Sequence, residues 1–244
     1  MQQRLPSRLD PPIAFAHRGA RAHAPENTIE AFRLALRLGA TGLESDVWAT
    51  ADGVAVLDHD GVVRRGIKRR SIGNCRRDEL PSHIPTLDEF FDECGSDFDL
   101  SLDVKHPEAY GPTVDAVRRR SVDAGRTWLC DPSLDRLIER REELADLKLV
   151  HSTRLDRLTT TPEVHAAKLA ETGIDVVNMH HTDWNGGLVT LFHRFGVHTF
   201  SWDLQFDHQL ETAFRMGVDA VYSDHTDTMI DIMQKEVGGS ERRS

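Results

Sequence analysis

Short apolar, β-rich stretches alternate with amphipathic helical stretches from residue 13 to about residue 235. This alternation is typical of a parallel sheet in which a helix follows each strand. The pattern predicts nine strands, at residues 13–18, 42–47, 54–59, 99–104, 127–130, 148–152, 175–179, 197–202 and 220–223. Nine strands are one too many for a closed eight-stranded barrel.

The spacing between two of these stretches identifies the surplus strand. Only "ADG", residues 51–53, separates "GLESDVWAT" from "VAVLDH". Parallel neighbours need a crossover of about a dozen or more residues, whereas antiparallel neighbours can be joined by a short turn. Residues 54–59 therefore form a hairpin arm, and the eight remaining strands predict a (β/α)8 TIM barrel. An open doubly wound sheet is the alternative.

Polar residues mark the start of two helices. In "PENTIEAFRLALRLG", Asn27 is predicted to be the N-cap, with Glu30 three residues later and Gly39 at the end. In "PTLDEFF", Thr86 precedes the helix and Glu89 lies in its first turn. The apolar residues that follow are expected to pack on the barrel.

Length and composition fit one domain over residues 1–244, with the barrel at about 13–235 and a disordered tail at 236–244. Hydrophobic residues make up 39% of the chain and charged residues 29%. No apolar run of about 18 residues could span a bilayer. No apolar segment follows the first arginines, so we see no secretory signal and expect a cytoplasmic location.

Charge and cysteine usage narrow the function further. The net charge of −10 argues against a nucleic-acid partner. The basic run "RRGIKRR", residues 64–70, is read as a solvated loop, with contact to an anionic substrate as the second reading. Cys75, Cys94 and Cys130 match no paired metal-ligand spacing, so we expect reduced thiols.

Acidic side chains recur on one face of two predicted strands. Glu44 and Asp46 project together because residues two apart in a strand share a face, and Ser101, Asp103 and Lys105 repeat this arrangement. In a barrel whose apolar faces meet the helices, these polar groups point inward. They then lie near the C-terminal mouth, where barrel enzymes carry their catalytic residues.

Three carboxylates in a partly dry mouth raise one another's pKa unless a cation neutralises them. All-oxygen ligands favour a hard ion, so Glu44, Asp46 and Asp103 predict a Mg²⁺ or Ca²⁺ site. The alternative, that each acid pairs with an arginine, explains one acid better than three at successive strand ends.

Two histidines close strands beside these acids, His17 in "AFAHRG" and His59 in "VLDHD". A histidine pair can supply one acid and one base near neutral pH. Arg18 and Lys105 add positive charge suited to a phosphate, although each could instead pair with a neighbouring acid. We assign no role to Asp58 and Asp60.

Several blocks of the chain together resemble a known family. These blocks are "AHRGARAHAPENTIEAF", "GATGLESDVWATADGVAVLDHD", "IPTLDEF", "LSLDVK" and "GVDAVYSD". In order and spacing they resemble the glycerophosphodiester phosphodiesterases, over about residues 13–235. The resemblance implies a TIM barrel of the phospholipase C-like phosphodiesterase type, with a short insertion after the HD motif at about residues 60–85.

The resemblance also implies roles for single residues. His17 and His59 would form the general acid/base pair, and Arg18 would contact the phosphate. Glu44, Asp46 and Asp103 would bind the divalent metal, with Lys105 beside the phosphoryl oxygens. The family's usual route is attack on phosphorus by the neighbouring glycerol hydroxyl, which forms a cyclic phosphate that water then opens.

The chain departs from the family pattern at two places. Asp103 stands where the family commonly has glutamate, which leaves the choice of metal open. The family's W-T-x-N appears as "FSWD", with Ser201 and Asp203 beside Phe200 and Trp202, the expected wall for the alcohol group.

Other polar residues near strand ends receive no catalytic role. His180, His181 and Trp184 are expected either to line the mouth or to lie on its rim. Asp224 corresponds to a signature that is mainly structural in the family, so it is left out of the catalytic set.

The implied function is metal-dependent hydrolysis of a small-molecule glycerophosphodiester to glycerol 3-phosphate and an alcohol. A lysophospholipase D-like hydrolase of lysophospholipids is an alternative, and it would need an apolar groove. A non-catalytic barrel that binds a phosphodiester is another, and it would be expected to lack one of the two histidines. The sequence leaves the oligomeric state open.

Overall fold

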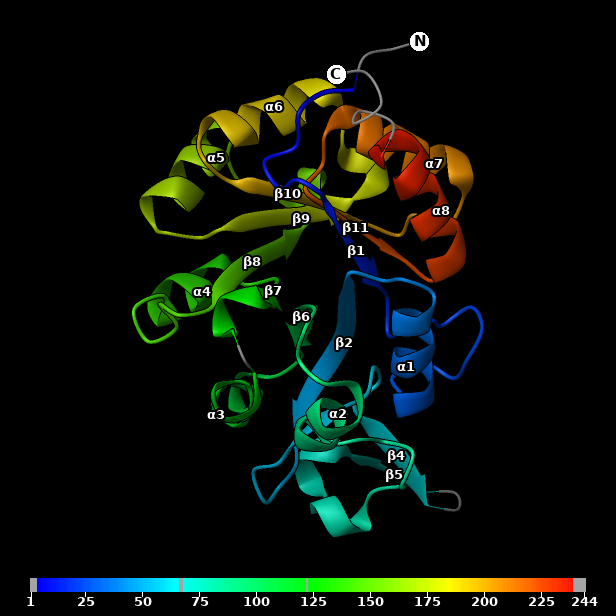
Figure 1. Ribbon diagram of the computed structural model, residues 1–244. Helices are drawn as coiled ribbons and strands as arrows, with labels where there is room; N and C mark the ends of the chain where they lie inside the picture. The colour runs from blue at the N-terminus through cyan, green and yellow to red at the C-terminus, as the bar shows by residue number, and fades with distance from the viewer. Residues whose placement is uncertain (1–3, 66–67, 122, 239–244) are drawn as a thin grey trace.

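The computed structural model describes residues 4–65, 68–121 and 123–238. Eight parallel strands close into a barrel, because β1 pairs with both β11 and β2 (Figure 1). The barrel order is β1, β2, β6, β7, β8, β9, β10, β11, so the (β/α)8 prediction is confirmed and the open sheet is wrong. The barrel strands are β1 (Ile13–Ala16), β2 (Gly42–Ala49), β6 (Asp99–Val104), β7 (Thr127–Asp131), β8 (Lys148–Thr153), β9 (Val176–His180), β10 (His198–Trp202) and β11 (Ala220–Ser223).

The ninth predicted strand is the antiparallel hairpin arm that the short "ADG" turn requires. Strand β3 (Ala55–Leu57) pairs with the end of β2, with Val47 opposite Leu57 and Ala49 opposite Ala55. It therefore extends β2 beyond the barrel without adding a strand to the closed sheet.

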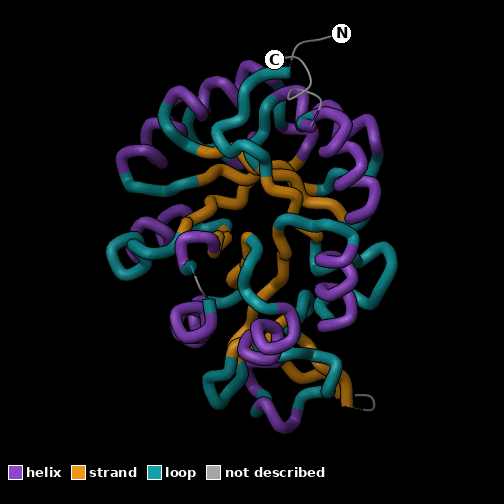
Figure 2. Tube along the Cα trace, in the orientation of Figure 1, coloured by secondary structure: helices purple, strands orange, loops and turns teal. Residues whose placement is uncertain are grey.

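Helices form the outer layer of the molecule around the central strands (Figure 2). Apolar side chains on their inner faces pack against the outward-facing residues of the strands, including Leu43, Val47, Leu102 and Val104. This leaves the alternate residues of the same strands pointing into the barrel. The helices are α1 (Ile29–Arg37), α2 (Leu87–Cys94), α3 (Tyr110–Arg120), α4 (Leu134–Arg140), α5 (Pro162–Glu171), α6 (Gly186–Arg194), α7 (Asp207–Met216) and α8 (Thr226–Glu236).

A layer of large side chains fills the interior of the barrel. The rings of Phe15 and Tyr222 stack with centroids 4.8 Å apart, and the Phe200 ring lies 5.0 Å from that of Trp128. All four belong to one buried cluster of inward-facing residues. The packed interior gives the polar residues nearer the C-terminal ends a solid floor.

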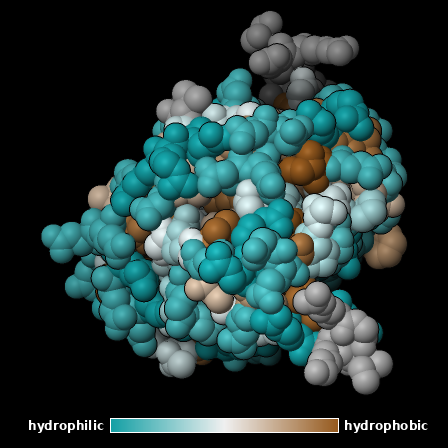
Figure 3. Space-filling view, turned by 90° about the horizontal axis from the view of Figure 1, so that it is seen from below, coloured by the Kyte–Doolittle hydropathy of each residue, from teal (hydrophilic) through white to brown (hydrophobic). Residues whose placement is uncertain are grey.

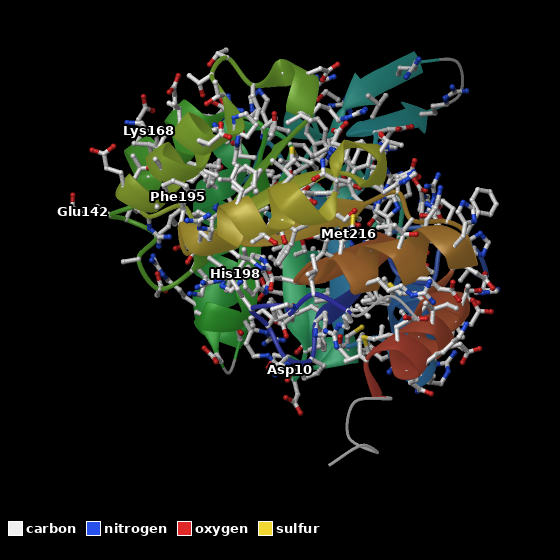
Figure 4. The ribbon with its side chains drawn as sticks, turned by 90° about the horizontal axis from the view of Figure 1, so that it is seen from above. Asp10, Glu142, Lys168, Phe195, His198 and Met216 are labelled. Atoms are coloured by element: carbon white, nitrogen blue, oxygen red, sulfur yellow. The ribbon has the colours of Figure 1, made fainter. Side chains whose placement is uncertain are left out.

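The N-terminal segment is tied to the barrel by Asp219, which is fully buried just before β11. Its carboxylate accepts hydrogen bonds from the backbone N–H groups of Arg8 and Leu9 and from the Ser7 hydroxyl. His198, which begins β10 and is labelled with Asp10 in Figure 4, lies 3.6 Å from the same carboxylate. Burial raises the pKa of Asp219, but its interactions with His193 and His198 and the hydrogen bond from the Thr199 N–H outweigh burial, so the net shift is downward.

The predicted insertion contains a second hairpin, β4 (Val62–Arg65) with β5 (Lys68–Ser71). The described part of "RRGIKRR" is thus strand, which corrects the loop prediction, and residues 66 and 67 lie outside the described residues. Gly61 precedes β4 with φ of +64°, and a Cβ there would lie 2.3 Å from the Trp48 ring. Its N–H donates to Asp58, so that carboxylate shapes the turn.

The helix starts test two further predictions. Thr86 precedes α2 as predicted, and together with Glu89 it forms a capping box. At α1 the N-cap is Thr28, whose hydroxyl accepts from the N–H of Ala31, so the assignment of Asn27 as N-cap is wrong. The side chain of Asn27 is buried and turned toward β2 instead.

The three cysteines are free thiols, as expected. The expected disordered tail starts at the last residue of α8, and its residues 239–244 lie outside the described residues. Among the described helices, none has the length and apolar character needed to cross a bilayer. The face seen in Figure 3 is largely hydrophilic, with small separate hydrophobic areas.

Candidate active site

A cavity of about 360 Å³ opens at the C-terminal ends of the barrel strands. It is lined by residues that lie on or directly after seven strands. Alternate side chains of a strand point inward, so the inward positions beyond the packed interior face this cavity. One side carries the charged residues of β1, β2 and β6. The opposite side comes from β8, β9 and β10. This is the size and position expected of a small-molecule site in a barrel enzyme.

The carboxylates of Glu44, Asp46 and Asp103 converge in this cavity, with one oxygen of each within 4.8 Å of the others. Lys105 Nζ donates to Asp46 Oδ1 at 2.8 Å, and Arg18 Nε lies 3.2 Å from Asp46 Oδ2. The backbone N–H of Arg18 donates to Glu44 Oε2 at 2.8 Å. The structure therefore brings together five of the predicted site residues.

Burial makes this cluster electrostatically costly. It raises the pKa of Glu44 to about 8, and the charges of Asp46 and Asp103 act in the same direction. Burial likewise raises the pKa of Asp103. A hard divalent cation fits this donor set, since it would neutralise the buried charge and all the converging atoms are oxygens.

Two unusual backbone conformations hold the first wall in place. Arg18 and Asn27 both have positive φ, at +52° and +55°. The amide of Asn27 donates to Asp46 at 3.3 Å and accepts from the Ser45 hydroxyl at 2.7 Å. Gly19 must be glycine, since a Cβ there would lie 2.7 Å from the backbone of Ala31. Strain at a cluster of functional groups is retained only where the surroundings enforce it.

His17 is held by a carboxylate that the sequence analysis left out. Its Nδ1 lies 2.6 Å from Asp224 Oδ1, and its Nε2 lies 3.9 Å from Glu44 Oε2. Burial lowers the pKa of His17, but the Glu44 charge and the Asp224 hydrogen bond outweigh it, so the net shift is upward. The pairing fixes the ring and leaves Nε2 as the nitrogen that faces the cavity.

His59, the second predicted histidine, is not brought into the cavity lining. Its side chain is 38% exposed, and its Nδ1 contacts Asp60 at 2.9 Å. The neighbouring N–H of Asp58 donates to the carbonyl of Asp46, which places this loop beside the acidic wall. His59 therefore lies on the hairpin arm next to the site, outside the group that converges.

The opposite wall contains two arginines that the sequence analysis did not single out. Arg154 pairs with Asp183 at 2.6 Å, and its guanidinium lies 5.9 Å from the centre of the Trp202 ring. Arg157 also lines the cavity. Trp202 is on the wall as expected, whereas Phe200 is fully buried in the barrel interior and does not line it, because it lies one layer deeper on β10.

The residues at the end of β9 divide between rim and core. His180 Nε2 contacts Asp203 Oδ2 at 3.0 Å, and His181 contacts Gln209. Neither histidine lines the cavity, and Trp184 is buried with its N–H donating to the Phe200 carbonyl. The two histidines therefore lie on the rim of the mouth and do not line it. Trp184 lies in the core.

A signal for some missed residues was present in the sequence. Asp224 directly follows the last strand, which barrel closure places next to β1. Asn178 lies at an inward position of β9, two residues after Val176. Arg154 and Arg157 follow β8, but nothing in their own segment marks them as cavity residues.

Known proteins are similar to this chain in sequence and in fold. The model of the glycerophosphoryl diester phosphodiesterase family matches residues 17–228. A glycerophosphodiester phosphodiesterase of Caldanaerobacter subterraneus is 26% identical, over 91% of this chain and 98% of the relative.

Solved structures agree with the fold. A glycerophosphodiester phosphodiesterase of Thermotoga maritima superposes with a TM-score of 0.79 at 23% identity, covering 90% of this chain and 97% of the other. An Oleispira antarctica phosphodiesterase in complex with the product sn-glycerol-3-phosphate gives 0.80 at 19% identity, covering 91% and 97%. With the family match over most of its length, the chain belongs to the glycerophosphoryl diester phosphodiesterase family.

Proposed function

We propose that the protein hydrolyses glycerophosphodiesters to glycerol 3-phosphate and an alcohol, with a divalent cation held by Glu44, Asp46 and Asp103. The observation that carries this proposal is the convergence of these three carboxylates with the His17–Asp224 pair in one cavity. The product named for the Oleispira antarctica structure supports the choice of glycerol 3-phosphate.

The chain's own residues would act in a simple sequence. Arg18 and Lys105 orient the phosphodiester, because fixed cations match its oxygens and the charge that develops on them. His17 Nε2 accepts the proton of the glycerol 2-hydroxyl as its oxygen attacks phosphorus, while Asp224 keeps the ring in position. The P–O bond to the alcohol breaks, the alcohol leaves with a proton from the second acid/base residue, and water then opens the cyclic phosphate to glycerol 3-phosphate. His59 is assigned the second acid/base role, from its place on the hairpin arm. When bound, the divalent cation, Mg²⁺ or Ca²⁺, would supply further positive charge to the phosphoryl oxygens.

The cavity lining favours a deacylated substrate over a lysophospholipid. Among the described residues that line it, Trp202 and Tyr222 are the only large apolar side chains, and none is aliphatic. A lysophospholipid would need an apolar groove for its acyl chain. The second enzyme reading therefore gains no support from this cavity.

The test compares substrates, metals and variants in one assay. We expect release of glycerol 3-phosphate from a glycerophosphodiester with Mg²⁺ or Ca²⁺, loss of activity with chelator, and little product from lysophosphatidylcholine. Replacing His17→Ala should lower kcat by about 100-fold or more, since general acid/base catalysis contributes about 10²–10⁴-fold. His208→Ala, which changes an exposed histidine on α7, is the matched control. No product with any metal would refute the proposal.

His59→Ala is examined in the same assay to assign the second proton transfer. We expect kcat to fall and one limb of the pH profile to disappear. Unchanged kcat and an unchanged profile would remove His59 from the mechanism.

A further inference from the structure

The cavity has two walls of different chemistry, and the barrel order places them opposite each other. Strand β9 is four strands from β2 in either direction around the barrel. The carboxylates and His17 lie on or directly after β1, β2 and β6. We use the name alcohol wall for the opposite lining residues Ser152, Thr153, Arg154, Arg157, Asn178, Trp202, Asp203 and Gln205. This wall lies across the cavity from the carboxylates and His17, to which we assign metal binding and proton transfer.

The geometry of in-line displacement predicts which half of the substrate contacts this wall. The attacking and leaving oxygens lie on opposite sides of phosphorus. On the proposed function, the glycerol 2-hydroxyl attacks from the side of His17, so the leaving alcohol is directed to the other side. That side is the alcohol wall, and this step rests on the proposed function.

Asn178 provides a hydrogen-bonding position on the alcohol wall that nothing else fills. The residue is 6% exposed and lines the cavity. Its Nδ2 contacts Ser152 Oγ at 3.2 Å, while its Oδ1 has no hydrogen-bond partner among the described residues. A buried polar atom without a hydrogen-bond partner is energetically unfavourable. Because Oδ1 is shielded from solvent, the amide must turn toward the cavity to bind a substrate hydroxyl, which can both donate and accept.

Among the described residues, the charges of the alcohol wall leave Arg157 as its unpaired cation, because Arg154 pairs with Asp183 and the carboxylate of Asp203 contacts His180. Arg157 is exposed at the cavity and forms no ion pair within the described part of the chain. Arg154 lies over the Trp202 ring, the position that a quaternary ammonium group would seek on an aromatic side chain. A choline group would therefore meet positive charge where it needs an open aromatic face.

We infer that the alcohol wall is the subsite for the leaving alcohol and selects a polyhydroxylated alcohol without a cationic group, one hydroxyl of which binds the Asn178 amide. This assigns a specificity role to Asn178 through direct contact and to Arg157 through charge. Glycerophosphoinositol and glycerophosphocholine are suitable probes, because they share the glycerol phosphate half and differ only in the alcohol.

The experiment measures the ratio of kcat/KM for glycerophosphoinositol to kcat/KM for glycerophosphocholine with the full chain. The ratio does not depend on the fraction of folded enzyme, so a variant that folds poorly still gives a valid result. We expect a wild-type ratio above one, a fall of about tenfold in Asn178→Ala, and a fall of about three- to fivefold in Arg157→Glu that weakens at high salt.

Two matched controls should leave the ratio unchanged. Thr113→Val removes a buried hydroxyl that also has no partner among the described residues but lies on α3, away from the cavity. Arg194→Glu makes the same charge change at an exposed arginine on α6.

The outcomes separate the inference from the proposed function. A wild-type preference for glycerophosphocholine overturns the inference, and so does an equal loss of both activities in Asn178→Ala, which would place the amide on the shared glycerol half. If neither diester is hydrolysed, the proposed function fails. Calorimetric affinities of the His17→Ala variant for the two diesters then decide the inference independently, and equal affinities or no binding overturn it.

Discussion

Replacing Asp224→Asn tests whether the His17–Asp224 pair positions the proton-transferring nitrogen. The carboxylate is a charged acceptor 2.6 Å from His17 Nδ1, and asparagine keeps its size while removing the charge. We expect the fold to survive, because the Asp224 side chain is 21% exposed and its other side-chain contact is a surface pair with Arg21. The substitution therefore isolates the effect on the imidazole.

The size of the effect follows from the kind of hydrogen bond that is lost. A hydrogen bond to a charged group contributes about 1.5–3 kcal/mol, which corresponds to roughly 10- to 150-fold in kcat if the bond is needed in the transition state. The Asp224 interaction also helps raise the pKa of His17 above its ordinary value. Its loss lowers that pKa, so the limb of the pH–rate profile that belongs to His17 should move to lower pH.

The assay is kcat and its pH dependence for a glycerophosphodiester with saturating divalent cation. Asp227→Asn is the matched control, because Asp227 pairs with His23 at 3.0 Å, both side chains are exposed, and neither lines the cavity. The control should stay within about twofold of the wild type. An Asp224→Asn enzyme with wild-type kcat and an unshifted profile would refute the positioning role.

Two further substitutions test the buried acid and the barrel interior. The pKa of Glu44 is raised from 4.5 to about 8 in the fold, so with chelator present the folded state keeps a proton that the unfolded chain loses, and the free energy of unfolding should fall as pH rises through this range. Glu44→Gln should remove most of that fall, on the order of a few kcal/mol, in denaturant titrations at pH 5, 6.5 and 8; parallel curves for both proteins would contradict the assignment. Phe200→Ala should lower the free energy of unfolding by about 3–5 kcal/mol through the cavity it leaves, with little change in KM. A raised KM at unchanged stability would instead indicate that Phe200 contacts the substrate.

The barrel was predictable from the sequence because its causes are local. Period-two runs define the strands, and the three residues of "ADG" allow only a hairpin between β2 and β3. The same periodicity placed Glu44, Asp46 and Asp103 on inward faces, which the structure bears out.

Other features depend on contacts between segments distant in the chain, and the sequence alone gave them the wrong role or none. Asn27 looks like an N-cap because its segment is typical of a helix start, yet its amide binds β2. Asp224 contacts His17 across 207 residues of chain, since barrel closure brings the last strand beside the first.

The local pattern of the chain was enough to predict the fold and the acidic, histidine-bearing wall, because backbone periodicity and turn length fix both. Which groups meet across the barrel depends on the folded chain. In the folded chain Asp224 and Asn27 contact site residues, and His59 lies on the hairpin arm beside the site. Asn178 and Arg157 lie opposite the carboxylates. Side chains on opposite strands share no local pattern, so closure of the sheet is the physical cause of their encounter.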